Sequence, residues 1–73
     1  MNYHEKPPFI GDIWIWQSQD AKYSKGPYLV LFDGVEDGQY WSVQVFNLTA
    51  TQKEVVFFYR GQPTYNDWLW KKL

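Results

Sequence analysis

The chain has 73 residues and a formal net charge of −1, from seven basic and eight acidic residues. This length accommodates a single domain. The absence of cysteine excludes disulfides, and a lone histidine, His4, leaves too few ligands for a structural zinc site. The charges are scattered rather than gathered into a basic stripe, so the composition does not favour a nucleic-acid partner.

The apolar residues are distributed in short runs, none of which is long enough to span a bilayer. The first eight residues contain no apolar signal core. We therefore expect a cytoplasmic protein that needs no membrane and no cofactor. Sixteen residues are Phe, Trp or Tyr, and each such side chain can bury about 150–250 Å². A dense aromatic core is thus expected to replace the disulfides or metal on which many small domains depend.

The first half of the chain predicts two strands behind an extended start. Residues 1–8 are expected to be a lead-in, because their two adjacent prolines oppose both helix and central strand. Residues 10–16 are rich in Ile and Trp and predict a first strand. Residues 27–32 predict a second strand that starts at a proline. Two Asp-Gly pairs then bracket a turn region over residues 33–38.

The second half contains the clearest strand of the sequence, residues 39–46. Trp41, Val43 and Val45 alternate there with more polar residues, which is the period of a half-buried strand. Residues 54–59 predict a fourth strand that is apolar at successive positions.

The end of the chain admits two interpretations. Residues 60–67 contain Gly and Pro and break the pattern, and residues 68–72 suit either a closing strand or a helical turn. We favour a short 3₁₀ turn followed by a strand. Five short strands at regular spacing then predict an all-β domain over residues 9–73, most simply a closed or nearly closed barrel.

One stretch carries a resemblance to a known fold. Residues 37–44, Asp-Gly-Gln-Tyr-Trp-Ser-Val-Gln, resemble the acidic turn and paired-aromatic strand of SH3 domains, with Tyr40 and Trp41 at the two aromatic positions. Residues 47–52 would then be the distal hairpin. The resemblance implies a single SH3-like five-stranded barrel. The Ala-Leu-Tyr-Asp-Tyr opening of SH3 domains is absent, so the resemblance concerns the barrel rather than polyproline binding.

A second resemblance covers only the first half. Residues 11–14, a polar loop and residues 26–31 look like the opening of the PemK/MazF toxin ribonucleases, which also have an SH3-like barrel. Those enzymes carry an arginine where this chain has Gly26, and Arg60 lies elsewhere, so we expect no nuclease activity. Small barrels that open in this way are frequent among phage-encoded proteins, which favours a phage origin.

The residues offer no catalytic constellation. Nucleophilic or acid–base catalysis needs a nucleophile, a base and an orienting group within mutual reach. The chain has no cysteine, one histidine in the lead-in, and carboxylates spread through turns. We therefore predict a protein that is not an enzyme.

The aromatic residues are the better candidates for function. Side chains alternate along a strand, so either Trp14 and Trp16 or Ile13 and Ile15 face the core, and some rings must lie outside. Core positions are expected for Trp41, Phe46 and a subset of Trp14, Trp16, Phe57 and Phe58. Tyrosine suits a partly exposed position, because its ring is apolar and its hydroxyl can contact water. The candidate partner-binding residues are therefore Tyr23, Tyr28, Tyr40, Tyr59 and Tyr65, flanked by Glu36 and Asp37.

This pattern predicts a non-catalytic interaction module that binds a peptide or protein face through exposed aromatics. Acidic turns beside the rings favour a basic or proline-containing partner. In a phage setting, the module would redirect a host protein or serve as a structural component. Two alternatives stay open: a single-stranded nucleic-acid binder that stacks bases on its rings, and a homo-oligomer whose extra rings form the subunit interface.

Overall fold

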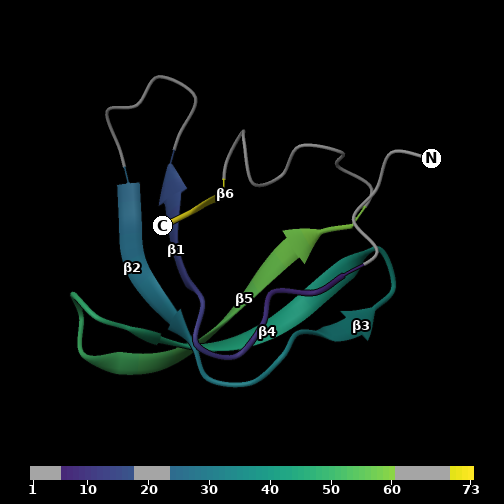
Figure 1. Cartoon of the computed structure of the whole chain (residues 1–73), viewed down its shortest axis with the longest axis horizontal. Coiled ribbons are helices and arrows are strands. Elements are labelled where there is room, and N and C mark those ends of the chain that lie inside the picture. Colours follow the sequence, from purple (N-terminus) through teal and green to yellow (C-terminus); the bar gives the residue numbers. More distant parts are fainter. Residues whose placement is uncertain (1–5, 18–23, 61–69) are drawn as a thin grey trace.

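In the computed structural model, residues 6–17, 24–60 and 70–73 are described, and every regular element among them is a strand (Figure 1). The strands are β1 (Ile13–Gln17), β2 (Ser24–Val30), β3 (Val35–Asp37), β4 (Tyr40–Asn47), β5 (Gln52–Tyr59) and β6 (Trp70–Lys72). This confirms the all-β class expected from the sequence. The 3₁₀ turn expected before the last strand falls outside the described residues.

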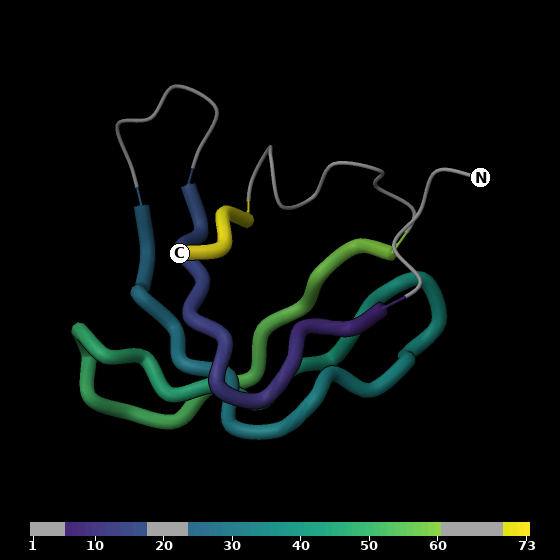
Figure 2. Tube along the Cα trace, viewed as in Figure 1, coloured from purple at the N-terminus to yellow at the C-terminus, as the bar shows by residue number. Residues whose placement is uncertain are grey.

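The strands form one antiparallel sheet in the order β3-β4-β2-β1-β6, with β5 paired to the other edge of β4. The β4–β5 ladder is the longest and runs from Tyr40 opposite Tyr59 to Asn47 opposite Gln52. On its second edge, β4 pairs with β3 at its start and with β2 at its end. Strands β2 and β3 thus pair with the same edge of β4, and the sheet curls into a half-barrel (Figure 2).

The short strand β3 was not expected from the sequence. It lies inside the region bracketed by the two Asp-Gly pairs and joins β4 through a two-residue turn, with Asp37 opposite Tyr40. Gly38 occupies the first turn position with a φ of 61°, a conformation that glycine adopts without steric cost. The acidic turn is therefore a hairpin rather than an open loop.

The core lies on the inner face of the half-barrel. The alternation expected along β4 is confirmed, because Trp41, Val43 and Val45 are all buried. The choice left open on β1 is also settled: Trp14 is buried and Trp16 packs against the core. The buried residues are Trp14, Tyr28, Val30, Trp41, Val43, Val45, Phe58 and Trp70.

Trp70, at the start of β6, reaches across the half-barrel to β5. Its ring stacks on Phe58, with the ring centroids 4.3 Å apart and the planes 22° apart. Its Nε1 donates a hydrogen bond of 3.2 Å to the carbonyl of Phe57, and its ring meets Tyr28 edge-on at 5.6 Å. The Trp70 indole therefore connects β6 to β5 and to β2.

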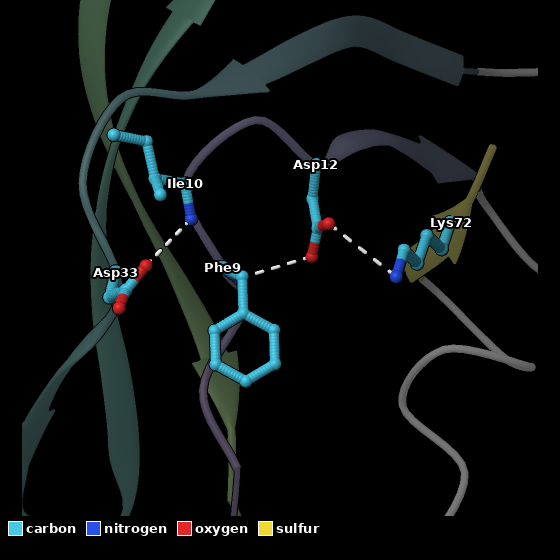
Figure 3. Close-up of polar contacts among 5 residues, drawn as sticks. All are labelled: Phe9, Ile10, Asp12, Asp33 and Lys72. Atoms are coloured by element: carbon cyan, nitrogen blue, oxygen red, sulfur yellow. Dashed lines mark hydrogen bonds and ion pairs between the residues drawn. The ribbon is translucent and has the colours of Figure 1, made fainter.

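The segment before β1 is fastened to the sheet by backbone groups and carboxylates (Figure 3). Asp12 accepts a hydrogen bond of 3.0 Å from the backbone nitrogen of Phe9, and its other carboxylate oxygen lies 3.4 Å from Nζ of Lys72. Asp33 accepts a hydrogen bond of 2.7 Å from the nitrogen of Ile10. These carboxylates satisfy turn and loop nitrogens, which is the role that aspartate usually has in such segments.

Candidate functional site

Three rings gather on the outer face of the β4–β5 ladder. Tyr40 and Tyr59 are direct cross-strand partners, and their ring centroids lie 5.4 Å apart. Phe57, two residues before Tyr59, meets Tyr40 edge-on at 6.2 Å. The side chains are 45%, 38% and 51% exposed, respectively. We call this cluster of Tyr40, Phe57 and Tyr59 the outer aromatic face.

Strand pairing explains why these rings point outward. Partners in an antiparallel ladder share a face, and successive residues alternate between faces. Trp41 pairs with Phe58, and both are buried, so the residues on either side of each must point away from the core. The same face carries two more exposed apolar residues, Val35 on β3 and Val55 on β5.

The ends of this outer surface carry opposite charges. Asp37 pairs with Tyr40, so it lies beside the outer aromatic face at one end. Lys53 pairs with Phe46 at the other end of the ladder. Both charged residues are exposed. The middle of the surface is apolar except for Ser42 and Gln44.

Glu36 is directed to the other side of the sheet. It pairs with the buried Trp41, and its carboxylate lies 3.1 Å from Nη2 of Arg60. The guanidinium of Arg60 also lies over the Trp41 ring, 4.8 Å from its centroid. Of the two acidic residues expected to flank the aromatics, only Asp37 therefore shares their face.

The tyrosines expected on the partner-binding surface have different placements. The structure brings Tyr40 and Tyr59 together on the surface. The expected exposure of Tyr28 is wrong: it is 4% exposed, because its ring packs edge-on against Trp70 in the core. Tyr23 and Tyr65 lie outside the described residues.

Phe57 is the surface residue that the sequence interpretation did not select. It was considered for the core, yet it is half exposed beside Tyr40. A signal was present in the sequence, since Phe57 lies two residues from Tyr59 and must share its face in a regular strand. The adjacent Phe58 then takes the inner position.

A polar hollow of about 470 Å³ opens beside the β4–β5 turn, away from the aromatic cluster. Within it, Gln52 and Asn47 donate hydrogen bonds of 2.9 and 3.0 Å to Oε2 of Glu54. These bonds hold the pKa of the Glu54 carboxyl below its ordinary value. Burial raises the pKa of Tyr28, and the charge of Glu54 raises it further. The lining of the hollow thus includes the Glu54 carboxylate, which hydrogen bonds of the hairpin hold, and the side chain of Tyr28.

Among the described residues, no three His, Cys, Asp or Glu side chains gather where a metal ion would bind. That part of the chain also contains no helix of sufficient length and apolarity to cross a membrane. Comparison with known proteins yields no matching family model, no matching curated protein and no matching solved structure.

Proposed function

We propose that this chain is a non-catalytic protein-interaction module that binds another protein chain through its outer aromatic face. The observation that carries the proposal is the clustering of Tyr40, Phe57 and Tyr59, each more than a third exposed, on one regular ladder. Aromatic residues are enriched at protein interfaces and dominate their energetics.

The amount of exposed ring surface supports a binding role. At roughly 200 Å² per aromatic side chain, the three exposed fractions leave about 270 Å² of ring in water. Covering that area is worth roughly 7 kcal/mol before the costs of association are subtracted, at about 25 cal/mol per Å². The rings also lie on a continuous ladder of eight residue pairs, so little ordering is needed when a partner binds.

The cations are placed in a way that favours a protein over a nucleic acid. Arg60 is engaged by Glu36 and Trp41, and Lys25 lies over the Trp16 ring at 5.6 Å. Strands β3, β4 and β5 contribute only one basic residue to the outer surface, Lys53. A surface that follows a phosphate backbone would need several such residues.

The setting of this function rests on the two sequence resemblances. They support an SH3-like barrel, and the curled antiparallel sheet of the described residues is consistent with such a fold. They also support a small phage-encoded protein of the bacterial cytoplasm. There the module would either redirect a host protein or act as a structural component.

A photo-cross-linking experiment tests whether another chain covers this surface. Benzoylphenylalanine replaces Phe57 in one variant and Phe32 in a second, and both are irradiated in a bacterial lysate. Phe32 is a matched control, because it is also an exposed phenylalanine but lies in the loop after β2. We expect a product specific to position 57, which mass spectrometry then identifies.

The identified protein is then purified and titrated against the parent and a Tyr40→Ser variant. Loss of at least tenfold in affinity, with unchanged circular dichroism, would support the proposal, since a central aromatic truncation commonly costs this much or more. Absence of any product specific to position 57, or equal affinity of the two proteins, would refute it.

A further inference from the structure

We infer that the outer surface of β3, β4 and β5 is self-complementary, and that a second copy of this chain packs on it face to face. This inference rests on the proposed function, because it names the partner of the same surface. Its basis is the combination of an apolar centre with opposite charges at the two ends. The apolar centre consists of Val35, Tyr40, Val55, Phe57 and Tyr59.

The first step of the argument is that this sheet is apolar on both faces. An antiparallel sheet commonly packs one face on a core and presents a polar face to water. Here the inner face holds Val43 and Phe58, and the outer face of the same two strands holds Tyr40, Phe57 and Val55. A second sheet packed about 10 Å away is the usual way to bury such a face.

The second step is that the charges at the two ends determine the orientation of that second sheet. Asp37 lies at the Tyr40 end of the surface, and Lys53 lies at the Phe46 end. Two copies packed with their β4 strands running the same way would place like charges together. A two-fold axis that reverses the strand direction places Asp37 of each copy near Lys53 of the other.

The third step is the position of the axis within the apolar centre. Midway along the ladder, Phe57 pairs with Ser42 and Val55 pairs with Gln44. In the reversed arrangement these residues of the two copies meet near the axis. Phe57 then packs against the Val55 region of the second copy, while the Lys53 ammonium approaches the Tyr59 ring. Apart from Ser42 and Gln44, the centre is apolar, and its two ends are charged, as in known interfaces.

The apolar area sets the expected strength of association. The three rings and the two valines together leave roughly 450 Å² in water, with fully exposed side chains taken as roughly 150–200 Å² each. That is about half of the 800 Å² per partner found in stable interfaces, so the charged rim must supply part of the contact. We expect a reversible dimer with a dissociation constant on the order of 10 μM.

Sedimentation velocity of the full chain, from about 1 μM to about 1 mM, tests this inference. The variants are Phe57→Ser, Asp37→Lys, Lys53→Asp and the double variant Asp37→Lys/Lys53→Asp. We expect Phe57→Ser to weaken dimerisation at least 30-fold, and each single charge reversal to weaken it about tenfold. The double variant should return to within about threefold of the parent, because its opposite charges meet again.

The double variant keeps the test valid even if a single variant loses stability. Residues 37 and 53 stand about 20 Å apart along the ladder, at roughly 3.4 Å per residue. This distance exceeds the Debye length, so rescue within one molecule is not expected. Phe32→Ser is the matched control and should dimerise like the parent.

A monomeric parent at about 1 mM would overturn the inference, as would a dimer unaffected by Phe57→Ser or a double variant no stronger than the singles. The proposed function is judged separately. A cross-link from position 57 to a different protein, with a monomeric parent, would refute only the second copy as the partner. Absence of any product specific to position 57, together with a monomeric parent at about 1 mM, would refute both.

Discussion

Arg60 joins β5 to the β3–β4 hairpin, and replacing it should destabilise the protein by about 2 kcal/mol. Its Nη1 donates a hydrogen bond of 2.8 Å to the carbonyl of Gly38, and its Nη2 lies 3.1 Å from the Glu36 carboxylate. Its guanidinium carbon lies 4.8 Å from the centroid of the buried Trp41 ring. The hairpin and the core tryptophan therefore share one cation.

Each of these contacts contributes a different amount to the free energy of unfolding. The cation–π contact is worth about 1 kcal/mol, and the charged hydrogen bond about 1.5 kcal/mol. The ion pair is worth about 0.5 kcal/mol, because the Glu36 side chain is 64% exposed. Among the described residues, Nε of Arg60 is buried without an acceptor, and this cost subtracts about 1 kcal/mol from the stabilisation. The net loss in Arg60→Ala is then about 2 kcal/mol.

Urea unfolding followed by tryptophan fluorescence measures these losses, provided that the denaturant slope is unchanged. Arg60→Lys should lose about 1 kcal/mol, because it keeps the charge but not the planar fork. Glu36→Gln should lose no more than about 0.5 kcal/mol. The reasoning is refuted if Glu36→Gln costs as much as Arg60→Ala, or if Arg60→Ala matches the parent.

Four further predictions concern stability and titration. A Cβ on Gly34 would lie 3.2 Å from Cγ2 of the fully buried Val43, so Gly34→Ala should cost about 1–3 kcal/mol in thermal unfolding; an unchanged melting temperature would contradict the tight packing. Thr51 has a φ of 59°, a strained conformation for a β-branched residue, so Thr51→Gly should gain about 0.5–1 kcal/mol in urea unfolding; a loss would show that the strain is not relieved. Ultraviolet titration should place the pKa of Tyr28 above its ordinary value of 10.0, and Glu54→Gln should lower it only part of the way, because burial is the larger cause. Since the folded state resists ionisation of Tyr28, stability should decline as pH rises above 10.0. For Glu54, whose folded-state pKa is lowered, the stabilising contribution should be lost as pH falls below 4.5, and this loss should be absent in Glu54→Gln.

Sequence patterning predicted the strands best where one face is buried. The alternation of residues 39–46 matches β4, because burial of Trp41, Val43 and Val45 imposes a period of two. The short strand β3 carries no such signal, since all of its residues are exposed. It forms because the Gly38 turn and the free edge of β4 bring it into register.

The candidate site was predicted in part. Tyrosines on strands with apolar residues on both faces were expected to be exposed. This expectation is correct for Tyr40 and Tyr59 and wrong for Tyr28. The local sequence around Tyr28 does not reveal that Trp70, more than forty positions later, packs against its ring. Phe57 was ambiguous because its neighbour Phe58 has the same side chain, and pairing with β4 places Phe57 on the outer face with Tyr59 and Phe58 on the inner face.

The sequence by itself determined that this chain is an all-β domain with more rings than one small core can hold. That conclusion needs only composition and the alternation of side chains along a strand. The tertiary structure decided which rings are outside and which of them meet. The register of β4 against β5 places Tyr40 opposite Tyr59 and next to Phe57, and the curl of the sheet sends Tyr28 and Trp70 inward. Register and curl arise from contacts between distant segments, so the outer aromatic face exists only in the folded chain.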